Sequence, residues 1–535
     1  MERAGSTPID AEAGVASCRS SSGSQDLHAS DDLNQLRHHV ESTKLAQLQT
    51  NKQRRKNSTL FMKQDTVIHW FRQDLRLTDN PALLSATKRG RVLPVFILDE
   101  ENSGKFAAGG ASQWWLSHSL NSLNRSLKGH LSVYKGNPMT VLSELADRFK
   151  VRAIHWNRCY EPWRMRRDAA IKSHFKTQGM DMESHNGSLL WEPWTIRKDD
   201  GSPYQVFTPF YRKGCLPYGE PRAPLSPPEQ ASYIADRRSP HACKPQALLP
   251  QNRWHEKLEP YWQVGEEGAH ARLKAFLEEG LMQYKTGRNY PSRPFVSRLS
   301  PYLRNGEISP QQIWHAVINL PRNKHVDHFC SELGWREFAY HLLYHYPDLP
   351  TKNLRPMFDT FPWKDDELRL HAWRKGKTGV PMVDAGMREL WETGYMHNRV
   401  RMIVGSFLVK NLGIHWKHGE RWFWNTLVDA DLANNSAGWQ WVAGSGSDAA
   451  TYFRMFNPVM QGQKFDPDGD YVRRWIPEID SLPTAYLFNP WEASDSVLSE
   501  AGIKLGVNYP SPIIDLTQSR DAAQAAFESL RKKHE

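Results

Sequence analysis

The sequence lacks several features that would place it in common protein classes. No apolar run of about 18 residues occurs, so no membrane span is expected. The first residues contain no apolar core of a secretory signal. The five cysteines are scattered without a C-x-x-C pair, which argues against a metal site or a disulfide framework and favours a reducing compartment. We therefore expect a cytoplasmic protein, or a nuclear or organellar one if the source is eukaryotic.

A dinucleotide-binding fingerprint is also absent. No G-x-G-x-x-G follows the first predicted strand, Thr66–Phe71. That strand runs instead into the charged loop Arg72–Asn80, and Pro81 then marks the start of a helix. The first βα unit is therefore not expected to bind NAD in the usual way.

The composition is that of a globular protein with a net positive charge. The 535 residues suffice for two or three domains, and 39% are hydrophobic and 24% charged. The net charge of +10 favours an anionic partner such as nucleic acid, although on charge alone an ordinary, mildly basic protein is an equal alternative. The 21 Trp and 18 Tyr suit a protein that stacks against rings.

The N-terminal half predicts a disordered extension followed by an α/β domain. Residues 1–63 are Ser-rich and charged and lack a sustained apolar period. Their basic cluster, Lys52–Lys56, is either a solvated tail or a nuclear address, and Met62 is an alternative start. Beyond them, short buried strands alternate with helical patterns, which predicts a parallel, Rossmann-like sheet over residues 64–195. The predicted strands are Thr66–Phe71, Val92–Leu98, Leu131–Tyr134 and Ala153–Trp156.

The C-terminal half predicts a helical domain. Residues 196–265 are rich in proline and are interpreted as a linker between domains. From residue 266 to 535 helical patterns dominate, for example Glu332–His345, Met387–Val409 and Arg520–Glu535. The predicted fold is therefore an α/β N-terminal domain joined to an all-α C-terminal domain.

The segment Asp429–Trp441 has the most unusual chemistry of the chain. It holds two carboxylates, two adjacent amides and two tryptophans. Carboxylates and amides are costly to bury without partners, whereas tryptophan favours burial. Such a segment indicates a large, flat ligand with polar edges.

Three further clusters lie in the predicted helical domain. Glu332, Trp335 and Arg336 share one helix face, which suits a base-sized ligand, or else forms an ion pair beside a core tryptophan. The turn 296–300, with Tyr284, offers donors for phosphates or a simple helix cap.

The third cluster lies on one face of a later predicted helix. Asn398, Arg401 and Met402 share this face, and Arg401 is predicted to pair with Asp429.

Five motifs together carry a family resemblance. They are Trp70–Pro81, Trp335–Phe338, Lys377–Met387, Met396–Arg399 and Gly438–Trp441. In this order they resemble the photolyase/cryptochrome family over about residues 64–490, and most closely a class I-type cyclobutane pyrimidine dimer photolyase.

The resemblance implies a U-shaped FAD in the helical domain. Asn435 takes the place that faces flavin N5, and Val296 stands where the family usually has Thr. The implied cofactor-binding residues are Tyr284, Val296, Ser297, Arg298, Leu299, Ser300, Arg401, Asp429, Ala430, Asp431 and Asn435. The implied catalytic residues are the electron-transfer tryptophans Trp439, Trp416 and Trp363, together with Asn435 and Glu332.

The resemblance also implies damaged DNA as the substrate. Met402 stands where relatives that repair (6-4) photoproducts carry a histidine for acid–base chemistry. The implied substrate- and DNA-binding residues are Arg288, Glu332, Trp335, Arg336, Asn398, Arg399, Met402, Trp441 and Gln461. UV-damaged DNA is thus the expected partner of a monomeric protein.

The function implied is light-driven repair of cyclobutane pyrimidine dimers by electron transfer from excited, reduced FAD. A blue-light-sensing cryptochrome without repair activity is the main alternative, and (6-4) repair is a second. A light-harvesting antenna of folate, deazaflavin or flavin type is expected near Asn157 and Glu161. Folate is disfavoured because no histidine stands in Lys105–Gln113.

Overall fold

The apolar segments of the first third form one parallel sheet in the computed structural model. The structure describes residues 65–236, 242–249, 253–448 and 454–534, so the predicted extension 1–63 lies outside it. The strand order is β3-β2-β1-β4-β5, and every neighbouring pair is parallel. The strands are β1 (Asp65–Phe71), β2 (Gly90–Leu98), β3 (Ser132–Lys135), β4 (Val151–Asn157) and β5 (Asp181–His185).

Four of these strands match the sequence prediction, and β5 was missed. Its residues, Asp181 to His185, are mostly polar and only partly buried, so they carry neither an apolar run nor a clear alternation. Position explains this composition, because β5 is an edge strand with one neighbour and needs little apolar surface.

Helices cover both faces of the sheet, as a parallel sheet requires. Alternate residues of β1 enter different apolar clusters, Ile68 and Trp70 on one face and Val67 and Phe71 on the other. Asn80 ends the charged loop after β1 and accepts a hydrogen bond from the Leu83 N–H (3.0 Å), which starts the first helix. The helices between strands are α2 (Pro81–Arg89), α3 (Gly110–Ser126), α4 (Pro138–Phe149) and α5 (Pro162–Thr177).

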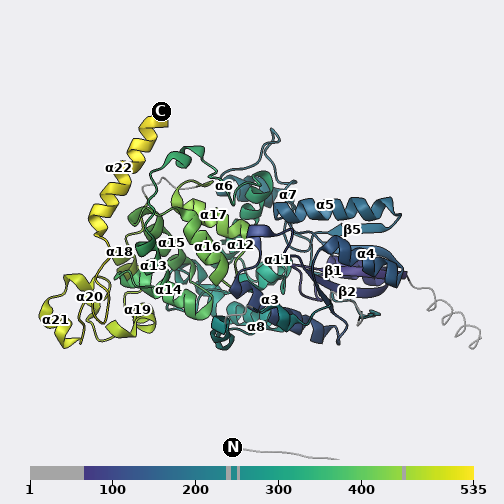
Figure 1. The fold of residues 1–535 in the computed structure, drawn as a ribbon, viewed down its shortest axis with the longest axis horizontal. Helices are drawn as coiled ribbons and strands as arrows, with labels where there is room; N and C mark the ends of the chain where they lie inside the picture. The colour runs from purple at the N-terminus through teal and green to yellow at the C-terminus, as the bar shows by residue number, and fades with distance from the viewer. Residues whose placement is uncertain (1–64, 237–241, 250–252, 449–453, 535) are drawn as a thin grey trace, which may run out of the picture. The chain divides into compact units, whose positions relative to one another are not determined.

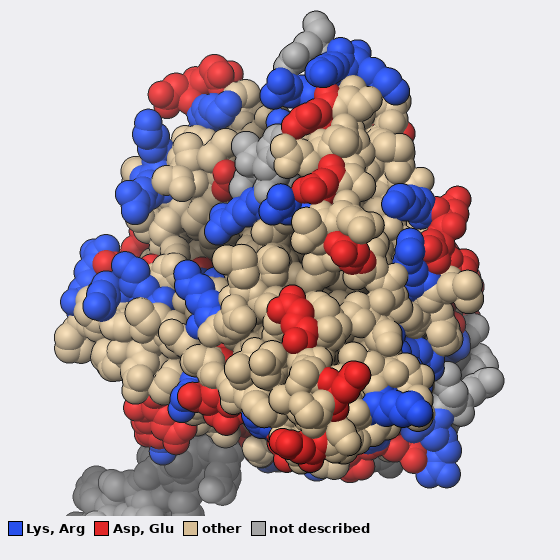
Figure 2. Space-filling view, turned by 90° about the vertical axis from the view of Figure 1, so that its left-hand side faces the viewer, with Lys and Arg blue, Asp and Glu red and all other residues tan. Residues whose placement is uncertain are grey.

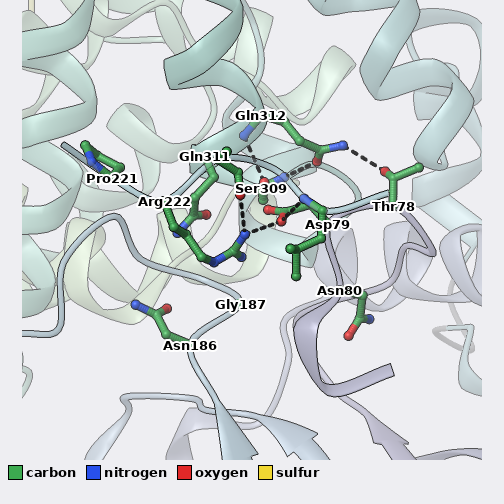
Figure 3. A network of polar contacts seen from close by, with 12 residues as sticks. Thr78, Asp79, Asn80, Asn186, Gly187, Pro221, Arg222, Ser309, Gln311 and Gln312 are labelled. Atoms are coloured by element: carbon green, nitrogen blue, oxygen red, sulfur yellow. Dashed lines mark hydrogen bonds and ion pairs between the residues drawn. The ribbon is translucent and has the colours of Figure 1, made fainter. Parts of the chain in front are cut away.

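Few regular elements occur between the sheet and residue 265. The described residues there form short helical turns, including α6 (Phe207–Pro209) and α7 (Leu216–Tyr218), and a 3₁₀ helix over Arg253–Tyr261. Polar contacts tie this segment and the loop after β1 to α11 (Pro310–Ile318). Figure 3 shows Arg222 pointing at the Asp79 carboxylate and Gln312 at the Thr78 hydroxyl, which it reaches at 2.8 Å.

The remainder is helical. From Asp65 onward the sheet part and the helical part belong to one compact unit, and Figure 1 shows them side by side. No described helix is long and apolar enough to cross a membrane. The principal helices are α8 (Glu266–Ala275), α9 (Tyr284–Gly287), α10 (Ser300–Asn305), α12 (Lys324–His345), α13 (Glu367–Arg374), α14 (Pro381–Thr393), α15 (Asn398–Ser406), α16 (Trp416–Thr426), α17 (Leu432–Ala443), α18 (Pro458–Phe465), α19 (Asp470–Trp475), α20 (Thr484–Leu487), α21 (Asp495–Glu500) and α22 (Leu516–His534).

The prediction of one helix over Met387–Val409 was wrong. Helix α14 ends at Thr393, where Gly394 adopts a left-handed conformation (φ 68°), and α15 starts only at Asn398. A glycine there reverses the chain without a side-chain clash. The break orients α15 separately from α14 and allows Asn398, Arg401 and Met402 to reach the cavity described next.

Candidate functional site

A cavity of about 580 Å³ lies within the helical part. Its walls come from three separated stretches, residues 284–304, α12 with its surroundings, and residues 395–447. Every residue predicted to bind the cofactor, from Tyr284 through the 296–300 turn to Asn435, lines this cavity. The fold therefore gathers them at one site, although they span about 150 positions of the sequence.

Asp429 is the central charged group of the cavity. Its Oδ2 accepts hydrogen bonds from the Arg401 guanidinium (2.8 Å) and the Ser300 hydroxyl (2.6 Å), which confirms the predicted Arg401–Asp429 pair. The other oxygen, Oδ1, is buried without a hydrogen-bond partner. Buried polar atoms are nearly always paired, so the orphan oxygen indicates a ligand that donates an N–H or O–H here.

Asp431, the second predicted carboxylate, has a structural role as well. It also lines the cavity, but its carboxylate is engaged by the protein itself. Oδ1 accepts from the Asn434 backbone N–H (2.8 Å) and side-chain amide (2.7 Å), and Oδ2 accepts from the Tyr340 hydroxyl. Asp431 is thus the N-terminal cap of α17, the helix that carries Asn435 and Trp439.

The turn at residues 296–299 is held from behind. Arg272 donates to the carbonyls of Ser297 (2.8 Å) and Val296 (3.0 Å). Arg298 adopts a positive φ of 52°, and its guanidinium lies over the Tyr395 ring at 4.8 Å. These contacts fix the turn as a rigid wall of the cavity before any ligand binds.

One hydrogen bond sets the direction of the Asn435 amide. Its Nδ2 donates to the Glu420 backbone carbonyl at 3.0 Å. Because a carbonyl only accepts, the nitrogen must face Glu420, which uses one of its two N–H groups and leaves the other N–H and the amide oxygen for a ligand. Asn435 therefore presents an acceptor, as well as a donor, to the cavity.

Trp439 is the only one of the three predicted electron-transfer tryptophans that lines the cavity. Its ring is 4% exposed and meets Phe423 edge-on, with the centroids 4.9 Å apart. Gly419 allows this placement, since a Cβ there would lie 2.1 Å from the indole. Trp373, which sequence reasoning missed, lies 6.2 Å from Trp439 between ring centroids.

Trp416 and Trp363 lie outside the cavity wall. Trp416 is fully buried on α16, next to α17, and donates from Nε1 to the Asn353 side chain at 2.8 Å. Between the rings of Trp416 and Trp363 stands His415, whose centroid is 5.4 Å from one and 4.9 Å from the other. No spacing pattern in the sequence predicted that His415 would lie between these two tryptophans.

Most of the predicted substrate residues line the other part of the same cavity. Glu332 accepts a hydrogen bond from Arg288, and Trp335 stacks on Phe207 with the ring centroids 3.9 Å apart. Phe207 comes from the irregular segment after the sheet and was not predicted. The predicted residues at this part of the cavity are Arg288, Glu332, Trp335, Arg336, Asn398, Met402 and Trp441.

Two predicted DNA-facing residues do not line the cavity. Arg399 donates to the Asn289 side chain and lies over the Phe465 ring at 4.4 Å. Gln461 is on α18. Sequence reasoning also assigned no role to several residues that do line the cavity, although Asn434 and Phe338 stand inside two of the segments singled out above. The residues concerned include Arg304, Phe338, Tyr395, Phe423 and Asn434.

A second, smaller cavity of about 80 Å³ lies beyond the ends of β1 and β2. Glu161, Arg164 and Gln113 help to line it. Asn157 does not line it, because its amide donates to Asp74 (2.6 Å) and Asn80 (2.7 Å) in the interior. Of the two residues expected near an antenna, only Glu161 is therefore available to a ligand in this cavity.

Comparison with known proteins gives consistent matches along the described chain. A family model described as DNA photolyase matches residues 67–229, and one described as the FAD binding domain of DNA photolyase matches residues 329–529. A deoxyribodipyrimidine photo-lyase of Agrobacterium fabrum is 46% identical, with 88% of this chain and 99% of the relative covered. Cryptochrome-2 of Arabidopsis thaliana is 38% identical, with 88% and 80% covered.

Solved structures agree with these matches. A bacterial class III photolyase from Agrobacterium tumefaciens has a TM-score of 0.83 at 45% identity, with 88% of this chain and 98% of that chain covered. An archaeal photolyase from Sulfolobus tokodaii, described with two FAD molecules, has a TM-score of 0.73 at 29% identity, with 87% and 100% covered. The predicted likeness to class I-type enzymes is not confirmed, because the first of these relatives is a class III protein.

Proposed function

The chain belongs to the photolyase/cryptochrome family, and from this premise we propose that it binds FAD and uses light to repair cyclobutane pyrimidine dimers in DNA. One observation carries the proposal. A single cavity joins a charged and amide-bearing part, at Asp429 and Asn435, to an aromatic part that holds Trp335 and Trp441. A cofactor and a flipped-out pyrimidine dimer can therefore lie in direct contact.

The charged part of the cavity fits FAD. Asp429 offers an orphan buried oxygen for a ring N–H or a hydroxyl, and Arg401 balances its charge. Asn435 presents its amide oxygen, an acceptor that favours a protonated N5 and hence the reduced flavin. When bound and excited by light, reduced FAD supplies the electron that opens the dimer and receives it back.

The aromatic part fits a flipped-out pyrimidine dimer. Phe207 stacks against Trp335 and holds that ring in a fixed orientation for stacking with a base. Arg288 orients the Glu332 carboxylate. Dimer splitting needs an electron but no proton-transfer histidine, in agreement with Met402 at its position. Extrusion costs least for a lesion that already stacks poorly, which gives selectivity for damage.

DNA binding is assigned to arginines around the cavity. Figure 2 shows one face of the molecule, on which basic and acidic side chains are interspersed without a large area of one sign. Arg288 and Arg336 line the cavity, and Arg399 is the last residue of the Met396–Arg399 motif. Such contacts position phosphates and make binding fall with salt.

A repair assay tests the proposal. Reduced protein is incubated with an oligonucleotide that carries a single dimer, under blue light and in the dark. We expect intact pyrimidines only in the light. Glu332→Ala should lower repair while the flavin stays bound, because the lesion loses a partly buried acceptor. Repair no greater than in the dark control would refute the enzyme assignment.

A signalling cryptochrome is the competing function. The family contains both classes, and a 38% identical relative is named as a cryptochrome. Asn435, with its acceptor turned to the cavity, favours repair. Absence of repair together with a protein partner that binds only after illumination would establish the competing function instead.

We further propose that the smaller cavity near Glu161 holds a second chromophore. Trp163 gives it an aromatic wall on which a flat pigment of deazaflavin or flavin type would stack, and Arg164 and Arg167 line it in ion pairs with Glu161 and Asp99. An absorption spectrum of chromophores released by heat identifies the pigment. A spectrum of FAD alone, at one molecule per chain, would contradict the proposal.

A further inference from the structure

The last two strands of the sheet bring three metal-ligand side chains to one place. The register pairs His155 of β4 directly with Glu183 of β5, and His185 follows Glu183 by two residues. Residues paired across parallel strands, and residues two apart on one strand, point to the same face of a sheet. All three side chains therefore share the face that α2 covers.

The spacing of the three groups is close to that of a metal site. Glu183 Oε2 lies 3.7 Å from His155 Nδ1 and 3.3 Å from His185 Nε2. One donor atom from each residue lies within 4.8 Å of the others, and no other such group occurs among the described residues. Tetrahedral Zn²⁺ with bonds of about 2.0–2.2 Å places its ligand atoms about 3.3–3.6 Å apart. A small rotation of the imidazoles completes this geometry.

The buried member of the group lacks a partner. His155 has no solvent exposure, and neither of its ring nitrogens makes a hydrogen bond within the described structure. Buried polar atoms are rarely left in this state. A neutral imidazole offers one ring nitrogen lone pair to a metal ion, and no group of the described protein competes for either nitrogen of His155 through a hydrogen bond.

A second residue already orients the carboxylate. The Ser85 hydroxyl, on α2, donates to Glu183 Oε2 at 2.9 Å. Such an outer hydrogen bond is usual behind a metal-binding carboxylate. The side chains of Glu183 and His185 are 44% and 28% exposed, so an ion has a path from solvent and a water can complete its coordination.

We propose that His155, Glu183 and His185 bind a divalent transition-metal ion, Zn²⁺, with water as the fourth ligand. The ion joins the edge strand β5 to β4 and satisfies the buried imidazole. Two histidines and one carboxylate with an open position form a familiar zinc set. The site lies in the sheet, away from the helical cavity, so it is independent of the proposed repair activity.

Metal titration of the full-length protein tests this site. The protein is treated with EDTA, dialysed and titrated with Co²⁺, whose visible bands report tetrahedral nitrogen and oxygen coordination, and Zn²⁺ is then added as competitor. We expect one ion per chain. Ser85→Ala should weaken binding by roughly 10- to 100-fold, and Glu183→Gln and His185→Ala should weaken it by more.

An exposed histidine gives the matched control. His174→Ala removes an exposed imidazole on α5 that contacts Gln178 and the edge of Phe175, outside the proposed site, and it should leave the affinity unchanged. Zn²⁺ should raise the melting temperature of the wild-type and His174→Ala proteins but not that of Glu183→Gln. Glu183→Gln keeps the side-chain shape, so it decides the question even if His185→Ala folds poorly. Equal affinity in wild type and Glu183→Gln, or no bound Co²⁺, would overturn the proposal.

Discussion

At the scale of single residues, the cavity is organised around a buried carboxylate. Asp429 depends on Arg401 for charge balance, and removal of one member of a buried ion pair costs about 3–5 kcal/mol. Arg401→Ala should therefore lower stability by several kcal/mol and reduce the flavin content of the purified protein. Urea unfolding measures the change in stability. The flavin absorbance of the purified protein measures the change in cofactor content.

The control for this pair is a charge-conserving change. Arg401→Lys retains the positive charge next to Asp429 and should retain most of the flavin, although it loses the second guanidinium contact to the Met396 carbonyl (2.7 Å). If Arg401→Ala bound as much flavin as Arg401→Lys, the charge of the pair would have no part in cofactor binding.

Gly419 makes a second prediction at this scale. A Cβ at this glycine would lie 2.1 Å from Trp439, so Gly419→Ala must displace the indole without removing it. Overpacking of this kind costs about 1–3 kcal/mol. We expect slower light-driven reduction of oxidised flavin, followed by absorbance under illumination, and unchanged repair by protein that is already reduced.

Trp439→Phe provides the comparison for Gly419→Ala. It removes the indole and should slow photoreduction at least as much. A Gly419→Ala protein that reduces its flavin at the wild-type rate would show that the position of Trp439 is not critical, even if Trp439→Phe is slow.

Residue chemistry could be predicted from the sequence where it depends on local spacing. Arg401 was assigned to Asp429 because helical spacing placed it with Asn398 and Met402. The role of Asp431 as a helix cap could not be predicted, since it depends on where α17 starts. The direction of the Asn435 amide depends on the Glu420 carbonyl, which only the packing of α16 against α17 supplies.

At the scale of elements, the motif Lys377–Met387 proves to be a scaffold. None of its residues lines the large cavity. Its aspartate, Asp384, is fully buried and accepts from the Thr378 N–H and hydroxyl (both 2.7 Å), the Gly379 N–H (3.0 Å) and the Tyr509 hydroxyl (2.9 Å). The carboxylate thus ties the start of α14 to the C-terminal segment.

Asp384→Ala should therefore destabilise the protein without changing any residue that lines the large cavity. Each buried donor left unpaired costs about 1–3 kcal/mol, so a loss of several kcal/mol is expected in urea unfolding. Asp366→Ala is the matched control, because Asp366 caps α13 through the Arg369 N–H (2.9 Å) and makes a half-exposed ion pair with the Arg369 guanidinium (3.3 Å), so its loss costs about 1 kcal/mol. Equal losses in the two variants would show that Asp384 acts as a simple cap.

The elements that sequence reasoning missed have a common cause. Strand β5 has little apolar character because it is an edge strand, and the His155–Glu183–His185 group exists only through its register with β4. The break at Gly394 was hidden because apolar residues continue on both sides of it. Local periodicity finds long, one-sided elements, but it does not report pairing partners or changes of direction.

At the scale of the whole molecule, Glu307 joins the sheet part to the helical part. It is fully buried between α10 and α11 and accepts a hydrogen bond from Trp115 Nε1 of α3 at 3.0 Å. Burial raises the pKa of Glu307 from 4.5 to about 8. The carboxyl group is therefore protonated in the folded protein at neutral pH, and its ionisation would leave a buried charge between the two parts.

The sign of the pH effect follows from this raised pKa. The unfolded chain releases the proton above about pH 4.5, whereas the folded protein holds it up to about pH 8. The stability that Glu307 contributes is complete below pH 4.5 and is lost as the pH rises towards 8. Between pH 5.5 and 8 the loss should amount to about 2–3 kcal/mol, at 1.36 kcal/mol per pH unit.

Glu307→Gln isolates this contribution. The amide oxygen can still accept from Trp115, but there is no proton to lose, so the urea midpoint should fall less between pH 5.5 and pH 8 than in the wild type. Both proteins share every other titrating group, so the difference between their pH slopes belongs to Glu307 alone. Parallel slopes would mean that Glu307 is ionised in the folded protein. The two parts would then be joined by a buried charge, and Glu307→Gln would stabilise the protein equally at both pH values.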